Sequence, residues 1–187
     1  MSAILDVPEI RARVHLLPVA DYRALAEDNP DYRHSEMIRG VIVEKEMKTP
    51  RHASLVDAVA EYLRHNVRGR LWVRREASLL LADSVPESDV AVVRGARADF
   101  HLAHPTTAAM VVEVAVTSLV SDREKAALYA EAGVDEYWIV LAEAGQVEVY
   151  RRPENGVYLT RRIYGQGEVI EEVGVADAPV PVAALFA

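Results

Sequence analysis

A long apolar segment in the second half of the chain constrains the fold more than any other feature. Residues 109–117 are Ala-Met-Val-Val-Glu-Val-Ala-Val-Thr, in which one charged residue interrupts an otherwise apolar run. A strand with one face in solvent alternates apolar and polar residues, whereas a strand buried on both faces is apolar almost throughout. The segment is therefore predicted to be a buried strand inside a sheet.

Helical and strand-like patterns alternate along the rest of the chain. Helices are expected over residues 18–27, 49–66 and 121–132, and strands over residues 35–39, 41–45, 71–75, 78–82, 89–93, 136–141, 146–151 and 157–164. Thr49 before Pro50 is a helix-start signal, while Gly40 and Asn155-Gly156 favour hairpin turns. This order predicts an α/β or α+β fold, a mixed β-sheet flanked by helices with an N-terminal hairpin.

The length and composition limit the class of protein. No repeat or linker divides the 187 residues, so we expect a single domain over residues 1–187, with a loose N-terminal arm at 1–15 and a C-terminal tail at 172–187. The chain has no cysteine, which excludes disulfide scaffolds, cysteine nucleophiles and thiolate zinc sites. No apolar run approaches the ~20 residues of a membrane helix, and residues 1–13 carry charges that do not fit a signal peptide. We therefore expect a cytoplasmic protein that does not enter a membrane.

Two acidic residues stand in segments that are otherwise apolar. Glu113 interrupts the run described above, and Asp89 begins the predicted strand Asp-Val-Ala-Val-Val. A buried carboxylate without a partner costs several kcal/mol, so it needs a cation, hydrogen bonds or a metal. Neighbouring strands can bring the two carboxylates together as hard oxygen ligands for Mg²⁺, which typically takes one or two protein carboxylates with water and phosphate. An ion pair of Glu113 with an arginine such as Arg75 is the structural alternative.

A lysine lies on the helix predicted after Glu113. Asp122, Lys125 and Tyr129 are spaced i, i+3 and i+7, which places them on one face of that helix. Lysine is scarce in this chain, which increases the interest of Lys125. A lysine beside two metal-bound acids can stabilise the charge of an attacked phosphate or orient a water. A solvated lysine on the helix surface is the alternative.

This order of acids and lysine resembles the PD-(D/E)XK nuclease superfamily, and the chain is more closely similar to the Uma-type restriction endonuclease family. The matching segments are Glu36 with Gly40-Val41-Ile42-Val43; Pro50-Arg51-His52; Pro86 with Asp89-Val90-Ala91-Val92-Val93; Val112-Glu113-Val114-Ala115; Asp122-Arg123-Glu124-Lys125; Tyr129-Ala130; Gly133; and Glu136-Tyr137-Trp138-Ile139-Val140. They extend over most of the chain. The resemblance implies a restriction-endonuclease-like fold.

The resemblance also implies a site and an activity. Asp89 and Glu113 would bind Mg²⁺ or Mn²⁺, and Lys125 would act beside the attacking water. Glu36 would complete the acidic cluster as a further metal ligand, and His52 would contact phosphate or water. The implied protein is a hydrolase, an endonuclease that cuts phosphodiester bonds in DNA and acts as a homodimer.

Two positions depart from the superfamily pattern. Glu87 and Ser88 separate Pro86 from Asp89, which makes Glu87 a rival for the role of Asp89. Ala115 stands where the superfamily pattern has lysine, and the Uma-type family instead supplies the lysine from the following helix. A second function therefore stays open: a catalytically degenerate nuclease-fold protein that acts as a binding or regulatory dimer.

The distribution of charge bears on DNA binding. The net charge of −8 argues against a protein coated in basic surface, but it allows one basic face on an acidic body. A cluster of arginines is compatible with contacts to a phosphate backbone and equally with a solvated face. The cluster consists of Arg64, Arg68, Arg70, Arg74 and Arg75.

Overall fold

The computed structural model describes residues 7–176 and 178–187. They form two compact units: one extends to Lys45 and includes Asp83–Val85, and the other comprises Glu46–Ala82 and Pro86–Ala187. The single domain expected over residues 1–187 stays a prediction. Residues 1–6 of the expected N-terminal arm lie outside the described residues.

Helices and strands follow one another in mixed order along the described chain. The helices are α1 (Pro8–Arg11), α2 (Val19–Asp28), α3 (Pro50–Asn66) and α4 (Leu119–Glu131), with short 3-10 helices at Pro30–His34, Arg97–Phe100 and Val182–Leu185. The strands are β1 (Ser35–Ile38), β2 (Val41–Glu44), β3 (Leu71–Ser78), β4 (Glu87–Arg94), β5 (Met110–Ala115), β6 (Glu136–Leu141), β7 (Gln146–Glu154), β8 (Val157–Gly165), β9 (Val169–Ile170) and β10 (Val180–Pro181).

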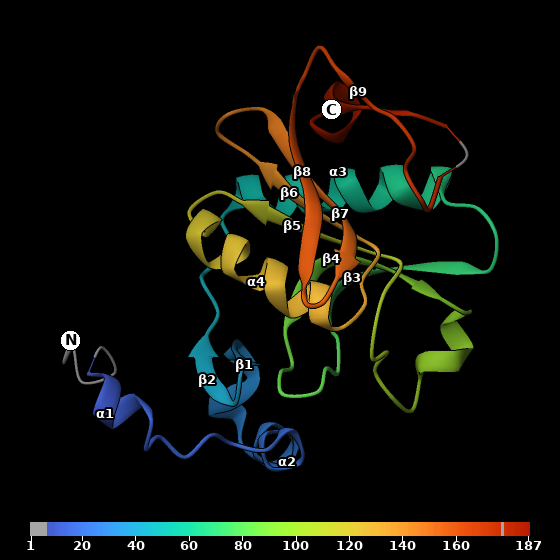
Figure 1. Ribbon diagram of the computed structural model, residues 1–187. Coiled ribbons are helices and arrows are strands. Elements are labelled where there is room, and N and C mark those ends of the chain that lie inside the picture. Colours follow the sequence, from blue (N-terminus) through green and yellow to red (C-terminus); the bar gives the residue numbers. More distant parts are fainter. Residues whose placement is uncertain (1–6, 177) are drawn as a thin grey trace. The chain divides into compact units, whose positions relative to one another are not determined.

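A six-stranded mixed sheet forms the centre of the larger unit (Figure 1). Its strand order is β3-β4-β5-β6-β7-β8, in which β5 and β6 are parallel and every other neighbouring pair is antiparallel. A parallel pair needs a crossover connection, and α4 provides it. All residues of β5 are buried, as the apolar run predicts. The mixed sheet with its helices confirms the predicted fold class.

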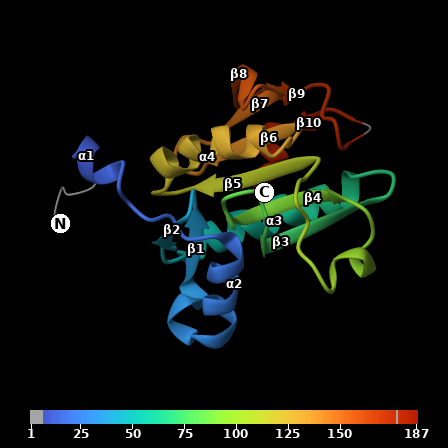
Figure 2. The same ribbon diagram turned by 60° about the horizontal axis from the view of Figure 1, so that its bottom comes forward.

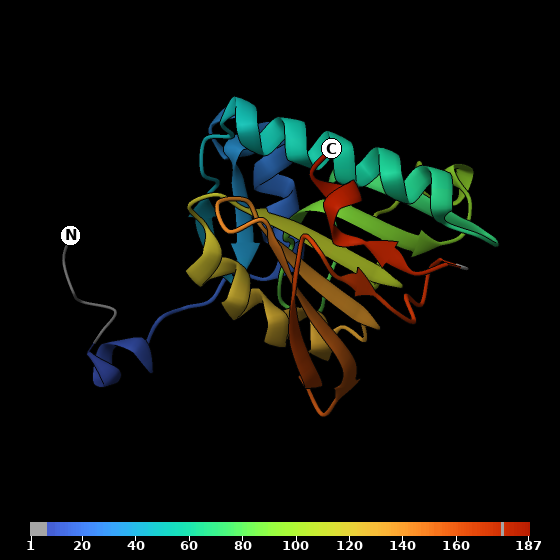
Figure 3. The same ribbon diagram turned by 90° about the horizontal axis from the view of Figure 1, so that it is seen from above.

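The two long helices of this unit cover opposite faces of the sheet (Figures 1 and 3). On one face, Val59 of α3 belongs to the same core cluster as Val112 of β5. On the other face, the ring of Tyr129 on α4 lies 4.9 Å from the ring of Tyr137, centroid to centroid. Because successive side chains of a strand point to opposite faces, Glu113 faces α4.

The smaller unit contains the predicted N-terminal hairpin, with α2 beside it (Figure 2). β1 and β2 pair antiparallel, and the side chain of Tyr22 on α2 donates a hydrogen bond to the backbone oxygen of Ser35 at 3.0 Å. Gly40 has a φ of +74°, and a Cβ at this position would lie 2.7 Å from Cβ of Leu16. The turn therefore requires glycine.

Local sequence signals explain where α3 begins and where the β7–β8 hairpin turns. Oγ1 of Thr49 accepts a hydrogen bond from the backbone N–H of His52 at 3.2 Å, which makes it the predicted N-cap of α3. Asn155 and Gly156 both have positive φ, 50° and 79°. This is the backbone of a type I′ turn, whose twist matches that of the paired strands.

One predicted strand is wrong. Residues 78–82 do not form a strand, because β3 ends at Ser78 and the chain then leaves the sheet. The leucines that suggested a strand are nevertheless buried: Leu79 is 0% exposed and Leu81 is 6% exposed. The backbone N–H of Leu79 donates to the backbone oxygen of Pro86 at 3.0 Å. Burial in a loop therefore produced the apolar pattern of a strand.

No helix within residues 7–176 and 178–187 is long and apolar enough to cross a membrane. The cytoplasmic location stays a prediction.

Candidate active site

The two predicted acids meet where the ladder between β4 and β5 ends. Regular pairing of these strands stops at Val90 and Val112, one residue short of Asp89 and Glu113. Beyond that point the carboxylates replace the backbone acceptors. Glu113 Oε2 accepts from the Asp89 N–H at 3.0 Å, and Asp89 Oδ2 accepts from the Val114 N–H at 2.8 Å. The two side chains therefore hold each other's strands at the point of separation.

The predicted lysine also reaches this point. Nζ of Lys125 lies 3.6 Å from Oε1 of Glu113, and its side chain is only 12% exposed. Tyr129, one turn further along α4, donates its hydroxyl to the same oxygen at 2.8 Å. The structure thus brings together Asp89, Glu113 and Lys125 and adds Tyr129, to which the sequence analysis gave no role. Its spacing of four residues from Lys125 was the available signal.

The environment of Glu113 favours its protonated form. Burial raises the pKa of Glu113 to about 8, Lys125 opposes this rise, and the nearby carboxylates of Asp89 and Asp122 add to it. The positive charge of one lysine therefore does not balance the negative charges of the acids gathered here, whereas the two charges of a divalent cation would.

His52 lies beside Asp89, while its predicted contact with phosphate or water stays a prediction. Nε2 of His52 donates to Oδ2 of Asp89 at 3.1 Å, because a carboxylate can only accept. The other ring nitrogen, Nδ1, is buried and has no hydrogen-bond partner among the described residues. His52 therefore orients Asp89 from the first turn of α3.

A second lysine stands close to the acids. Nζ of Lys48 lies 2.9 Å from a carboxylate oxygen of Glu76 and 3.5 Å from one of Glu87. Burial of the ammonium lowers the pKa of Lys48, but the hydrogen bond to Glu76 and the charge of Asp89 outweigh it and raise the pKa above its ordinary value. The scarcity of lysine was the only signal for Lys48. Glu87, the rival of Asp89, points to this lysine, while Asp89 meets Glu113.

Glu36 and Arg75 were also named from the sequence. Glu36 lies on β1 opposite Val43 in the smaller unit, so its place in the acidic cluster stays a prediction. Arg75, the structural alternative as partner of Glu113, instead contacts Asp57 and Glu76.

The donor set fits a hard divalent cation. Asp89 and Glu113 provide carboxylate oxygens, and both hydrogen bonds of the Asp89 side chain found in the described chain fall on Oδ2, which leaves Oδ1 for another ligand. Among residues 7–176 and 178–187, no three His, Cys, Asp or Glu side chains are grouped to hold a metal. Two carboxylates suffice for Mg²⁺, which keeps several waters, whereas a structural zinc site needs four protein ligands.

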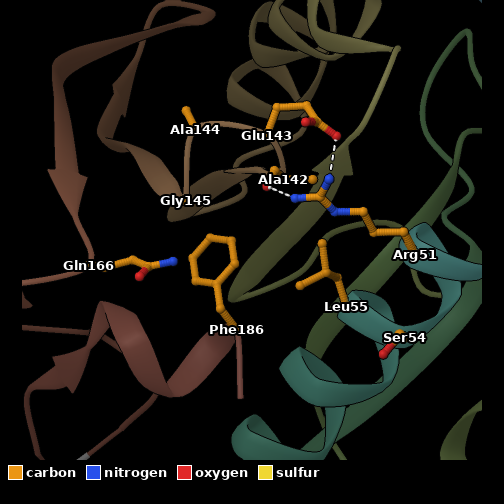
Figure 4. A pocket seen from close by; sticks show the side chains of 9 residues that line it. All are labelled: Arg51, Ser54, Leu55, Ala142, Glu143, Ala144, Gly145, Gln166 and Phe186. Carbon is orange, nitrogen blue, oxygen red and sulfur yellow. Dashed lines mark hydrogen bonds and ion pairs between the residues drawn. The ribbon is translucent and has the colours of Figure 1, made fainter.

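A cavity of about 500 Å³ opens near the start of α3 (Figure 4). Arg51 enters it and donates to the carboxylate of Glu143 and to the backbone oxygen of Ala142. The ring of Phe186 lies opposite, beside Gln166. Because Glu143 already neutralises Arg51, this cavity presents no free positive charge to a phosphate.

Comparisons with known proteins agree with the fold. Residues 19–180 match the Uma2 family, described as "Putative restriction endonuclease". A solved structure, described as a putative nuclease belonging to DUF820 from Anabaena variabilis ATCC 29413, is similar with a TM-score of 0.74 and 16% sequence identity. That similarity covers 91% of this chain and 97% of the other. No curated protein matches. Because the family match extends over most of the sequence, the chain belongs to the Uma2 family of restriction endonuclease-like proteins.

Proposed function

We propose that this chain is a Mg²⁺-dependent endonuclease that hydrolyses phosphodiester bonds in DNA. One observation carries the proposal. Two buried carboxylates, Asp89 and Glu113, meet at the point where their strands separate, and the ammonium of Lys125 stands 3.6 Å from one of them. Membership of a restriction endonuclease-like family supports the same reaction.

The metal would be held by Asp89 and Glu113. When bound, a divalent ion lowers the pKa of its water and neutralises charge on the attacked phosphate. Mn²⁺ has the same preference for oxygen ligands and would serve in its place. Glu36 remains a proposed further ligand.

The protein groups around the acids have distinct roles. Lys125 supplies a fixed positive charge that stabilises charge building on the phosphate and orients the attacking water. Tyr129 and the N–H of Asp89 fix the two oxygens of Glu113. His52 and the N–H of Val114 fix Asp89. A homodimer would present two such sites to the two strands of a duplex.

Cleavage of supercoiled plasmid tests the proposal. We expect nicking with Mg²⁺ or Mn²⁺ and none with EDTA. Lys125→Met and Asp89→Asn should each lower the rate by about 100-fold or more, the usual effect of removing a group that stabilises transition-state charge. Asp135→Asn is the matched control, because Asp135 is exposed and pairs with Arg94 on the surface.

The same experiment decides against the alternative of a degenerate, regulatory nuclease fold. That alternative predicts no cleavage with either metal, and it predicts that Asp89→Asn leaves Mn²⁺ binding unchanged in calorimetry. Cleavage by Lys125→Met at the parental rate would assign the activity to another protein in the preparation.

A further inference from the structure

A pocket of about 370 Å³ lies at the edge of the sheet formed by β3. Its lining includes four arginines and one tryptophan, and we name it the arginine pocket. These residues are Arg64 of α3, Trp72, Arg74 and Arg75 of β3, and Arg97 of the 3-10 helix that follows β4. Its volume falls within the ~300–1,000 Å³ of small-ligand sites.

The positive charges in this pocket are unusual because most of them are not neutralised. Within the described parts of the chain, Arg64, Arg74 and Arg97 have no carboxylate partner. Arg75 is the exception, since it contacts Asp57 and Glu76.

Arginines elsewhere in the larger unit are usually paired. Carboxylates contact the following guanidinium groups: Arg51, Arg70, Arg94, Arg123, Arg151, Arg161 and Arg162. The chain has more acids than bases, so acids were available for the arginine pocket as well. Unneutralised guanidinium groups around one pocket indicate an anionic ligand.

Arg74 gives this indication more weight, because it is 7% exposed. Its guanidinium donates to the backbone oxygen of Ser78 at 3.1 Å and lies 3.1 Å from Nδ1 of His104, while its Nε is buried without a partner among the described residues. The Cζ atom of Arg74 lies 5.6 Å from the ring centre of Trp72. A cation removed from water without a counter-charge is costly, and a bound anion would offset that cost.

The position of the pocket relates it to the candidate active site. Arg74 pairs with Ala91 on β4, and Ala91 lies two residues from Asp89 on the same sheet face. Two residues along a strand and one strand across are about 6.8 Å and 4.8 Å, so the two backbones lie within ~10 Å. Successive phosphates of a DNA strand advance about 3.4 Å along the helix axis. The pocket is therefore a few nucleotides from Asp89.

We propose that the arginine pocket binds a backbone phosphate of the nucleic acid, a few nucleotides from the bond that is cut. This inference rests on the proposed function and adds where the substrate backbone runs: from Asp89 outward across β4 and over the edge strand β3. Phosphate contacts of this kind position a substrate without reading its sequence.

Binding measured apart from cleavage tests the inference. Fluorescein-labelled DNA, as a duplex and as the corresponding single strand, is titrated with full-length Asp89→Asn protein in EDTA at several salt concentrations. Adding Arg64→Gln and Arg97→Gln together should weaken binding about 10-fold and lower the slope of log affinity against log salt by about 1 to 2, since each phosphate that is no longer neutralised reduces it by roughly 1. Both side chains are exposed, so the fold should persist, and thermal unfolding checks this. Arg162→Gln is the matched control, because Arg162 is exposed and paired with Glu168.

A second readout reports on the pocket itself. Trp72 lines it, whereas Trp138 is 0% exposed in the core. Bound DNA should change the tryptophan fluorescence of the parent protein and leave that of Trp72→Phe unchanged. Inorganic phosphate serves as a separate arm, and a response to phosphate without one to either DNA would overturn the assignment to nucleic acid.

The outcomes separate this inference from the proposed function. Loss of binding in the double arginine variant, without cleavage by the parent protein, would support the phosphate site and contradict the proposed nuclease activity. Cleavage by the parent protein, with unchanged affinity and salt slope in the double variant, would support the nuclease activity and overturn the proposal that the arginine pocket binds phosphate.

Discussion

Glu113 and Glu148 lie in one row of the central sheet, on either side of Ile139. Their surroundings shift the pKa of the two carboxyl groups in opposite directions. Both are buried, at 3% and 0% exposure, and each accepts a hydrogen bond from a tyrosine hydroxyl at 2.8 Å. Burial and neighbouring acids raise the pKa of Glu113 to about 8. Hydrogen bonds to arginines overcome burial and lower the pKa of Glu148 to about 2.

The difference comes from the cations around each acid. Arg123 and Arg161 both contact Glu148, so two positive charges offset one negative charge. Glu113 has one close lysine and shares its surroundings with Asp89 and Asp122. A buried acid with surplus cations stabilises the fold, whereas a buried acid among further acids is left with uncompensated negative charge, which the divalent ion proposed above would offset. Perturbed carboxyl groups in such settings mark functional sites.

The largest expected effect follows from removing the charge of Glu113. Glu113→Gln should lower plasmid cleavage at least about 100-fold, because the proposed metal site would lose a ligand. Its free energy of unfolding should stay within about 1 kcal/mol of the parent value or rise, because a glutamine carries no charge into the core. Nicking rates and urea titrations measure the two effects. A large loss of stability would show that Glu113 serves the fold and not the site.

The corresponding change at Glu148 should give the opposite result. Glu148→Gln should lower the free energy of unfolding by about 1–3 kcal/mol, because two arginines lose their shared carboxylate. This loss is smaller than the ~3–5 kcal/mol typical of breaking a fully buried pair, because both arginines are partly exposed. The folded fraction should cleave at the parental rate. Glu168→Gln, which alters an exposed pair with Arg162, is the control and should leave the midpoint of urea unfolding unchanged.

The contrast between the two glutamates also explains what the sequence could predict. The apolar run around Glu113 predicted a buried strand and an acid that needed a partner, and both features are present in the structure. Glu148 has a similar apolar setting in Gln-Val-Glu-Val-Tyr, but its arginine partners come from α4 and β8, and only the folded chain brings them together. Long-range pairing of this kind has no local sequence signal.

Local chemistry set the limits of prediction elsewhere in the chain. The Thr49 cap and the Asn155-Gly156 turn depend on neighbouring residues, and both were predicted from sequence. The leucines at 79 and 81 are buried by packing and not by strand pairing, so the apolar pattern gave a wrong strand there. The roles of Lys48 and Tyr129 depend on contacts between elements, which the sequence does not specify.

The pH dependence of stability in EDTA should separate the two acids further. The folded pKa of Glu113 lies above its ordinary value of 4.5, so the folded state binds the extra proton between pH 4.5 and 8. Its contribution to stability is therefore greatest below pH 4.5 and is lost as the pH rises to about 8. Glu148 behaves in reverse: its contribution is present above pH 4.5 and is lost as the pH falls toward 2. Urea unfolding at pH 5 and pH 8 should show a decline in the parent protein that is smaller in Glu113→Gln. An equal decline in both proteins would contradict the raised pKa.

The smallest expected effects come from the two tyrosine hydroxyls, and they give the most closely matched comparison. Tyr129→Phe and Tyr150→Phe each remove one hydrogen bond of 2.8 Å to a buried glutamate and leave the ring in place. Each should cost about 1 kcal/mol in the free energy of unfolding, the usual net value of such a bond. Only Tyr129→Phe should also slow cleavage, by a few-fold to about 10-fold, because it loosens the orientation of Glu113 beside Lys125. The single-turnover rate with Mg²⁺ in excess measures this difference. Equal rates for the two variants would mean that the orientation of Glu113 does not limit the reaction, and a slower Tyr150→Phe would place Glu148 in the active site as well.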